Sequence, residues 1–236
     1  MSPLTPENRE ALKKVSAATL TTVLFKRGFR NVFIQGVFLL NQKAPHMVGE
    51  AYTLRYIPAR EDLDQLGAFE GRHPQREAIE ACPAGHVLVM DARRDASAAT
   101  GGDILMTRLQ VRGVAGVVTD GGLRDTPTIE KLAWPAYCGA RSAPLNLVKH
   151  HAVDSQVPIG CGGVAVYPGD IVVGDAEGVV VIPAAIANEV AAEALAQTEF
   201  EDWVEARVKE GRPILGLYPP DAKTRAEYES WKKGRT

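Results

Sequence analysis

The spacing of apolar residues predicts two helices near the start of the chain. Leu20 and Leu24 lie one helical turn apart, and Ser16 precedes them where an N-cap residue is expected. Thr5, followed by Pro and Glu, has the composition of an earlier helix start. We therefore expect a helical segment before the first strand.

Four apolar runs predict buried strands, because they are short, partly β-branched and bounded by turn-forming residues. They cover residues 32–40, 47–57, 86–91 and 114–119. The charged segment 59–76 shows no such pattern. It is either a solvated loop or a lid over a functional site, and the pattern alone favours the loop.

The region from Gly162 to Pro183 is rich in β-branched residues. It holds three strand-like runs, VAVY, IVVGD and VVVIP, separated by Pro-Gly and Glu-Gly turns. We expect three consecutive antiparallel strands here.

The last fifty residues are predicted to be helical. Residues 184–210 are Ala-rich and acidic and end before Gly211. Their apolar stripe is weak, so part of this helix is expected to pack against another subunit. A final helix begins after Asp221.

Composition limits the classes of function. With 236 residues, 45% of them hydrophobic, the chain can form one domain, with a core at about 16–183 and an extension at about 184–236. A net charge of −2 means that the chain lacks the excess of positive charge that is typical of proteins binding nucleic acid or an anionic membrane. No run is long enough to span a membrane, and the N-terminus lacks the apolar region of a signal peptide. Three widely spaced cysteines argue against a disulfide framework or a zinc site, so we expect a cytoplasmic protein.

The stretch from residue 100 to 129 has the order loop, helix, strand, loop. Ile104, Leu105 and Leu109 are expected on the apolar side of the helix, and Gly113 stands where a left-handed C-cap residue belongs. The strand at 114–119 then leads into a second polar loop.

Chemically useful groups gather in these two loops, 100–103 and 120–125. Two glycines open the helix, so the amides around Gly102 can approach an anion closely, and the helix dipole favours negative charge there. The second loop places Arg124 and Asp125 at the C-terminal end of a strand, where open α/β sheets usually hold ligands. Together they suggest a metal-assisted site for a small carboxylic acid.

Each of these residues has two interpretations. Arg124 can fork onto a carboxylate, and Asp125 can hold Mg²⁺ or Mn²⁺, ions that need only one or two protein carboxylates. Alternatively, both only form a loop pair before a helix with Thr126 as its N-cap. Asp103 either shares the metal or only favours the helix N-terminus. Asp120 is either a metal-supporting residue or a turn former.

Other chemistries lack support in the sequence. No GxGxxG, P-loop or GxSxG motif is present, and neither Lys131 nor Lys149 has an apolar setting that would activate an amine. A Schiff-base mechanism is therefore not expected.

Two segments resemble a known family. GGDILMTRLQVRGVAGVVTDGGLRD and PGDIVVGDAEGVVVIP are similar to the RraA-like family, which groups 4-hydroxy-4-methyl-2-oxoglutarate/4-carboxy-4-hydroxy-2-oxoadipate aldolases with the regulator of ribonuclease activity A. The resemblance runs from Ser16 to about Pro183. It implies one RraA-like α/β domain over residues 1–236, with a swivelling β/β/α-type core, N-terminal helices and a helical C-terminal tail. It also implies a homotrimer or homohexamer with sites at subunit contacts.

The resemblance also implies a function. Arg124 would bind the substrate and steady the enolate, Asp125 would hold Mg²⁺ or Mn²⁺, and the backbone amides from Gly102 through Asp103 and Ile104 to Leu105 would hold the carboxylate of a 2-oxo acid. The expected protein is a class II-type lyase that cleaves a 4-hydroxy-2-oxo acid to pyruvate and a second carbonyl compound, with oxaloacetate decarboxylase side activity. The alternatives are a non-catalytic regulator that inhibits a ribonuclease, and a sugar-acid lyase or dehydratase.

Overall fold

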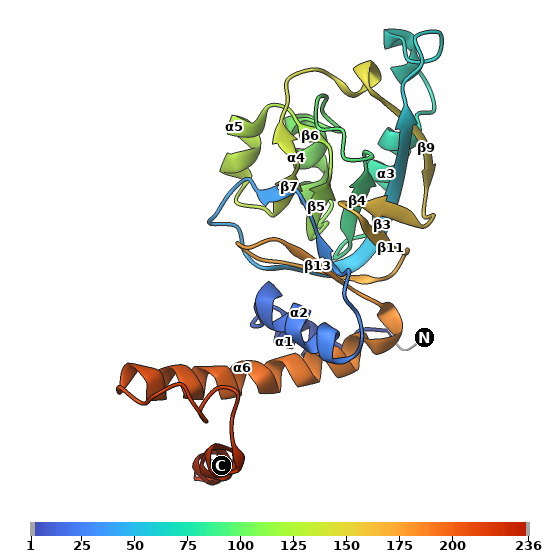
Figure 1. The fold of residues 1–236 in the computed structure, drawn as a ribbon. Coiled ribbons are helices and arrows are strands. Elements are labelled where there is room, and N and C mark those ends of the chain that lie inside the picture. Colours follow the sequence, from blue (N-terminus) through green and yellow to red (C-terminus); the bar gives the residue numbers. More distant parts are fainter. Residues whose placement is uncertain (1–2, 235–236) are drawn as a thin grey trace.

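The computed structural model describes residues 3–234 and places helices around a mixed β-sheet (Figure 1). The α-helices are α1 (Pro6–Leu12), α2 (Ala17–Lys26), α3 (Pro74–Ala81), α4 (Asp103–Val111), α5 (Thr126–Ile129), α6 (Ala187–Lys209) and α7 (Ala222–Lys233). The 3-10 helices are η1 (Leu66–Phe69), η2 (Glu130–Leu132), η3 (Asn146–Val148) and η4 (Ala184–Ile186). The strands are β1 (Phe33–Ile34), β2 (Phe38–Leu39), β3 (Met47–Pro58), β4 (Val87–Asp91), β5 (Gly116–Thr119), β6 (Gly122–Leu123), β7 (Ala136–Cys138), β8 (Ala140–Arg141), β9 (His150–Ser155), β10 (Ile159–Cys161), β11 (Val164–Val166), β12 (Ile171–Gly174) and β13 (Val179–Ile182).

The main sheet has the order β1-β13-β12-β3-β4-β5-β7-β2, and β9 also pairs with β3. Its centre, β3-β4-β5-β7, is parallel, whereas β1, β13, β12, β9 and β2 pair antiparallel to their neighbours. The predicted α/β class is therefore confirmed. In this arrangement the segments that follow β4 and β5 leave the sheet at the same edge, which brings the two polar loops together.

The predicted single strand at 32–40 is wrong, because the chain turns in its middle. Gly36 has a φ of 74°, in the left-handed region that favours glycine, and it separates β1 from β2. These two strands occupy opposite ends of the sheet order although only three residues separate them. Because four steps of extended chain reach at most about 14 Å, the sheet must curl until its two ends come close.

The three predicted strands at 162–183 exist, but they are not all neighbours. β12 and β13 pair antiparallel as expected, whereas β11 forms a hairpin with β10. Gly162 and Gly163, both with positive φ, make the turn of this hairpin. β12 already pairs with β13 on one edge and β3 on the other, so it has no free edge for β11.

Both predicted N-terminal helices are confirmed with their caps. The hydroxyl of Thr5 accepts the amide of Asn8 at 3.2 Å, and that of Ser16 accepts the amide of Thr19 at 3.1 Å. α1 and α2 lie between the sheet and the first half of α6 (Figure 1), and apolar side chains of all three helices join those of β12 and β13 in one core.

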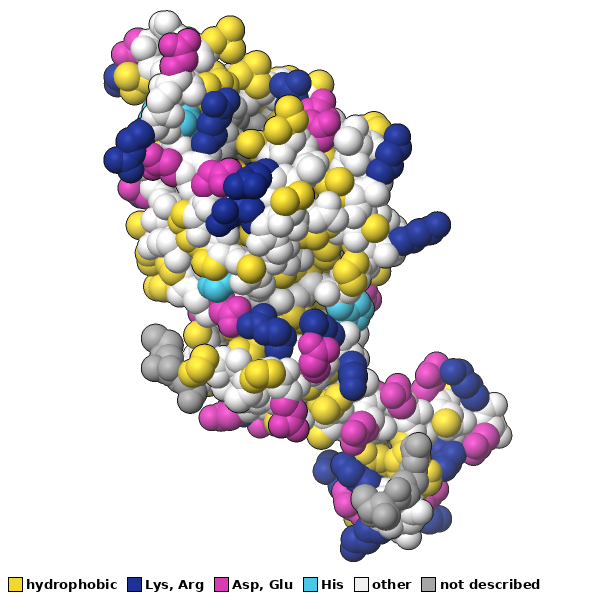
Figure 2. Space-filling model, turned by 180° about the vertical axis from the view of Figure 1, so that it is seen from behind, with side chains coloured by type: hydrophobic (Ala, Val, Ile, Leu, Met, Phe, Trp, Pro, Cys, Tyr) yellow, Lys and Arg dark blue, Asp and Glu magenta, His cyan; other side chains and the backbone are white. Residues whose placement is uncertain are grey.

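The C-terminal half of α6 leaves the body of the molecule and packs against α7 and the segment that leads into it (Figure 1). Trp203, Val204, Leu217 and Tyr228 form a separate small core there. Asp221 caps α7 by accepting the amide of Thr224 at 2.8 Å, as predicted. We call residues 200–233 the arm. In Figure 2 it again projects from the body, whose visible face carries Lys, Arg, Asp and Glu side chains interspersed.

Two further expectations concern membrane-spanning helices and disulfide bonds. Within residues 3–234, none of the helices combines the length and apolarity needed to cross a membrane. Cys82, Cys138 and Cys161 are all buried and free, in agreement with the expected lack of a disulfide framework.

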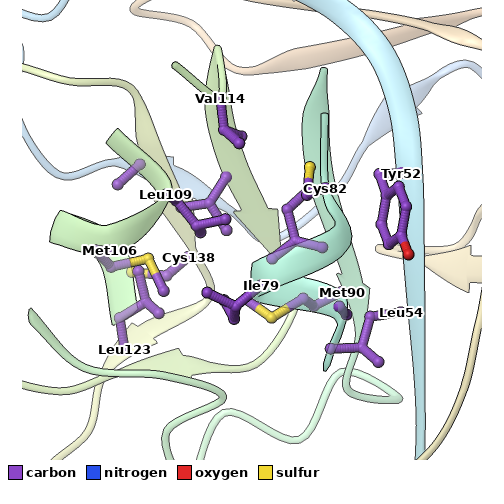
Figure 3. Close-up of a cluster of buried hydrophobic side chains, with 14 of the residues drawn as sticks. Tyr52, Leu54, Ile79, Cys82, Met90, Met106, Leu109, Val114, Leu123 and Cys138 are labelled. Carbon is purple, nitrogen blue, oxygen red and sulfur yellow. The ribbon is translucent and has the colours of Figure 1, made fainter. Parts of the chain in front are cut away.

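A second core holds α3 and α4 against the sheet, and Figure 3 shows its side chains. Ile79 and Cys82 of α3 pack in the same cluster as Met106 and Leu109 of α4. Leu105 is only partly buried and Ile104 is 79% exposed, so the predicted apolar side of α4 is wrong at Ile104. The core fixes the two helices whose N-terminal ends face the candidate site.

Candidate active site

A cavity of about 390 Å³ lies where the segments following β4 and β5 meet. All six residues predicted for the site line it, together with residues from η1, α3 and η3. Its lining residues are Leu66, Phe69, Gln75, Arg76, Ala99, Gly101, Gly102, Asp103, Ile104, Leu105, Arg124, Asp125, Leu145 and Asn146. The volume is near the lower end for ligand pockets, which suits a small molecule.

Backbone hydrogen bonds join the two polar loops side by side. The amide of Thr100 donates to the carbonyl of Gly122 at 2.8 Å, and the amide of Gly122 donates to Ala98 at 3.1 Å. One step further, the amide of Arg124 donates to the carbonyl of Gly101 at 3.0 Å. This short parallel ladder sets the start of α4 directly against the Arg124-Asp125 pair.

Gly102 is required here because of space. Its backbone is extended, with a φ of −130°, so other residues could adopt the conformation. A Cβ atom at this position, however, would lie 2.7 Å from Oδ2 of Asp125 and 3.0 Å from Cγ of Arg124. Any side chain would therefore push the Arg-Asp pair away from the helix start.

Arg124 and Asp125 form a partly exposed ion pair. Nε of Arg124 lies 3.1 Å from Oδ2 of Asp125, and the side chains are 42% and 40% exposed. The predicted N-cap at Thr126 is wrong by one residue, because Asp125 occupies that position and its backbone carbonyl accepts the amides of Thr128 and Ile129. The carboxylate of Asp125 makes no cap hydrogen bond. It is thus directed to Arg124 and the cavity rather than to the helix, which argues against a purely capping role.

The N-terminus of α4 supplies backbone donors to the same cavity. The helix starts after Gly102 without a side-chain cap, and the amides of a first turn have no partner within their own helix. Asp103 supplies one partner, since its Oδ1 accepts the amide of Ile104 at 2.8 Å. Of the predicted carboxylate-binding amides, that of Ile104 therefore already has an acceptor, whereas those of Asp103 and Leu105 donate no hydrogen bond to this carboxylate.

Buried groups behind the cavity fix the first loop. Gln75 donates from Nε2 to the carbonyl of Thr100 at 2.6 Å, and the hydroxyl of Tyr56 donates to the same carbonyl at 3.3 Å. Burial raises the pKa of the Tyr56 phenol well above its ordinary value, so it stays a protonated donor. Asp120 is also structural: its carboxylate accepts the amides of Ala92, Arg94 and Gly162.

The charged segment 59–76 forms one wall of the cavity through Leu66, Phe69, Gln75 and Arg76. Its position supports the lid interpretation over that of a loop free in solvent. Asp64 anchors it, with Oδ1 2.8 Å from Nδ1 of His151. The sequence did not predict these wall residues, although the apolar pair Leu66 and Phe69 within a charged segment was an indication that could have been used.

The residues present fit a hydrated divalent ion better than an enclosed metal centre. Across residues 3–234, no cluster of three or more His, Cys, Asp or Glu side chains is placed to hold a metal. Mg²⁺ and Mn²⁺ keep several waters and need only one or two carboxylates, and Asp125 presents a partly exposed one to the cavity. Asp125 would therefore be the residue that holds such an ion.

Comparison with known proteins identifies the family. The family model described as "RraA-like: Aldolase/RraA" matches residues 16–181. The chain belongs to the RraA-like family. The match covers the sheet, the cavity and the Arg124-Asp125 pair, and it ends before α6.

Proteins with similar sequences carry different names. A protein of Halalkalibacterium halodurans named "Putative 4-hydroxy-4-methyl-2-oxoglutarate aldolase" is 40% identical over 138 residues, which are 58% of this chain and 60% of that protein. Protein DlpA of Legionella pneumophila is 27% identical over 168 residues, 71% of this chain and 26% of that protein. The matched region thus spans less than two thirds of either relative.

Solved structures confirm the RraA-like fold. RraAS2 of Streptomyces coelicolor, described as an unusual member of the RNase ES inhibitor RraA protein family, has a TM-score of 0.77 and 29% identity over 87% of this chain and 98% of its own. An uncharacterized Pseudomonas syringae protein has a TM-score of 0.79 at 23% identity, covering 92% of this chain and 100% of its own. The second likeness concerns the fold alone.

Proposed function

We propose that the protein is a divalent-metal-dependent lyase of the class II aldolase type. It cleaves a 4-hydroxy-2-oxo acid to pyruvate and a second carbonyl compound, and it decarboxylates oxaloacetate as a side activity. The observation that carries the proposal is the Arg124-Asp125 pair, which lies directly beside the N-terminus of α4 in the lining of a small cavity and whose carboxylate does not cap a helix.

The chain's own residues have defined roles in this reaction. Amides at the start of α4, helped by the helix dipole, bind the carboxylate next to the 2-oxo group. Arg124 donates to the 2-oxo oxygen, where negative charge develops. Asp125 would hold Mg²⁺ or Mn²⁺, which supplies Lewis-acid stabilisation of that charge. When the C3–C4 bond breaks, the 4-hydroxyl loses its proton and becomes the second carbonyl, while C3 of the pyruvate enolate takes up a proton.

The names of two relatives support a lyase. The Halalkalibacterium halodurans protein and a Pseudomonas aeruginosa protein, the latter 31% identical over 125 residues, both carry the name "Putative 4-hydroxy-4-methyl-2-oxoglutarate aldolase". Both share only part of their length with this chain. Metal dependence and decarboxylation therefore belong to the proposal and rest on the site.

The direct test is oxaloacetate turnover by the purified chain. We expect pyruvate formation that is lost with a chelator and restored by Mg²⁺ or Mn²⁺. Borohydride should not trap pyruvate on the protein, because only an imine to a lysine is reduced in that way. Metal-independent turnover, or a reduced pyruvyl adduct found by mass spectrometry, would overturn the mechanism.

A regulator is the second candidate, favoured by the likeness to RraAS2 at a TM-score of 0.77. In this reading the chain inhibits a ribonuclease by docking on it, and the cavity has no turnover. The two functions separate in one pair of assays: the regulator predicts no reaction with 2-oxo acids at any metal concentration, together with dose-dependent inhibition of a purified RNase E-type enzyme.

A further inference from the structure

Two buried side chains hold the loop that leads into α4. His150 of β9 is fully buried, and its Nε2 lies 3.2 Å from the carbonyl oxygen of Ala98. Two residues further along the loop, the hydroxyl of Tyr56 on the neighbouring strand β3 donates to the carbonyl of Thr100 at 3.3 Å. The rings of His150 and Tyr56 lie 5.7 Å apart. The two rings therefore hold alternate carbonyls of one loop.

The carbonyl of Ala98 connects His150 to both polar loops of the site. It also accepts the amide of Gly122 at 3.1 Å, two residues before Arg124. The next residue in the first loop, Ala99, lines the cavity, whereas His150 does not. A shift of the Ala98 carbonyl would therefore disturb the start of α4 and the Arg124-Asp125 pair together, so any effect of His150 on the site passes through this contact.

Only the neutral ring of His150 fits this position. A carbonyl oxygen accepts and cannot donate, so Nε2 carries the hydrogen, and Nδ1 of the neutral ring carries none. Nδ1 is buried and makes no hydrogen bond within the described residues. A proton on Nδ1 would place a charge and an unpaired donor in the interior, and both are costly there.

The groups around the ring favour the same state. The ionisable side chains that face His150 are Tyr56 on β3 and Arg93 and Asp95 after β4. Burial is the main cause that lowers the pKa of His150 below its ordinary value, and the charge of Arg93 adds to this effect. The Ala98 carbonyl and Asp95 oppose it only in part.

We propose that neutral His150 is a positioning residue for the carboxylate-binding loop before α4, and that protonation of its ring disorders this loop as the pH falls. The inference rests on the proposed function and extends it to control by pH. A proton binds the ring more readily when the loop is displaced, so the ordered loop is stable above the ordinary histidine pKa of about 6.5 and loses stability below it.

The pH dependence of oxaloacetate turnover tests this role. The measurement is kcat/KM with Mg²⁺ between pH 8 and pH 5, corrected for the uncatalysed reaction. His150→Gln keeps an amide donor and cannot become charged. It should match the unmodified protein within about twofold at pH 8, and the ratio of its kcat/KM to that of the unmodified protein should rise roughly threefold or more by pH 5. His150→Leu removes the donor and should lower kcat/KM roughly fivefold or more at pH 8.

An exposed histidine provides the control. His46 immediately precedes β3, at the opposite end of this strand from Tyr56. His46→Gln should therefore reproduce the pH profile of the unmodified protein. Thermal melts at each pH check that all variants are folded.

Hydrogen exchange followed by mass spectrometry reads the loop without turnover. After correction for the intrinsic pH dependence of exchange, protection of residues 98–106 in the unmodified protein should fall roughly threefold or more between pH 7.5 and pH 5.5. His150→Gln should keep this protection, and residues 187–199 of α6 should keep theirs in both proteins. Because the unmodified protein alone gives the first result, this test does not depend on the folding of a variant.

The outcomes separate this inference from the proposed function. Parallel pH profiles of the unmodified protein and His150→Gln, equal losses in His150→Gln and His150→Leu, or protection of residues 98–106 that does not change with pH would each overturn the role of His150. Metal-dependent turnover with parallel profiles would leave the lyase intact and remove only this role. Loss of protection at low pH that His150→Gln prevents, without turnover, would keep the role and contradict the lyase.

Discussion

Asp125 combines two features that are rarely found without a reason. Its φ of 54° places a residue with a Cβ in the left-handed region, at a cost of about 1–3 kcal/mol. Its side chain does not recover this cost by capping α5, although it stands at the N-cap position. Strain of this kind concentrates at functional sites, where the surrounding structure holds it in place. The backbone thus supports the same assignment as the chemistry of the side chain.

Substitution of the Arg124-Asp125 pair tests its role directly. Asp125→Asn keeps the shape and tolerates the left-handed backbone, but it removes the charge that would hold the metal, so we expect no detectable oxaloacetate turnover. Arg124→Lys keeps the charge and loses the planar fork, with an expected loss of at least roughly tenfold, about 1.4 kcal/mol. The measurements are steady-state kinetics and thermal melts.

A second Arg-Asp pair provides the control. Arg55 and Asp154 lie 3.8 Å apart, with side chains 48% and 53% exposed, outside the cavity. Asp154→Asn should leave turnover unchanged, because exposed pairs of this kind contribute little. Turnover near that of the unmodified protein in folded Asp125→Asn would instead shift the assignment towards the ribonuclease regulator.

Sequence patterns located some site residues and could not locate others. Gly102, Arg124 and Asp125 stand beside predicted element ends, where local pattern carries information. Arg76 and Asn146 are separated from them by tens of residues and reach the cavity only through tertiary packing. Short-range periodicity contains no trace of such contacts, so this half of the site could be found only in the folded chain.

At the scale of elements, α3 links the wall of the cavity to the start of α4. The helix begins with Gln75 in its first turn, and Ile79 packs with Met106 and Leu109 in the core shown in Figure 3. The amide of Gln75, which is 3% exposed, holds the carbonyl of Thr100 just before the two glycines. We infer that Gln75 is a positioning residue for the loop that leads into α4.

Gln75→Glu tests this link with almost no change in shape. When the introduced carboxyl group is ionised it offers no donor to the Thr100 carbonyl, so we expect roughly tenfold lower kcat/KM at neutral pH. When it is protonated, its hydroxyl can donate, and the deficit should shrink as the pH falls. The measurement is the ratio of variant to unmodified kcat/KM between neutral pH and pH 5. A ratio that does not change with pH would show that Gln75 only supports stability.

Local sequence patterns predicted the helix caps correctly and some of the strands incorrectly. The caps at Thr5, Ser16 and Asp221 depend on one side chain and the next turn, and all three are confirmed. The prediction of one strand at 32–40 is wrong because this apolar stretch supplies strands at both ends of a curled sheet. The turn at Gly36 hardly changes the hydrophobicity of the stretch, so the pattern does not reveal it. The predicted antiparallel pairing of β11 with β12 is wrong for a similar reason. Both edges of β12 are taken by β13 and β3, and a local pattern does not show which strand edges are free.

At the scale of the whole molecule, the arm is the part least covered by the rest of the chain. Its small core of aromatic residues leaves large apolar side chains at the surface, with Ile214 51% and Leu215 90% exposed. Exposed apolar patches commonly mark interaction surfaces, and most soluble oligomers are closed symmetric assemblies of one chain. The homotrimer or homohexamer expected from the sequence stays a prediction, and these side chains are where its contacts would be sought.

We therefore predict that light scattering at micromolar concentration gives the mass of a trimer or hexamer, and that the arm contributes to its contacts. Leu215→Asp should shift the mass towards smaller species without lowering the melting temperature of the isolated subunit, because the side chain packs on almost nothing within its own chain. Tyr167→Asp is the control: Tyr167 is 57% exposed but lies at the end of β11, away from the arm, so the mass should not change. A stable monomer with full oxaloacetate turnover would contradict the assembly, and an unchanged mass in Leu215→Asp would place the contacts outside the arm.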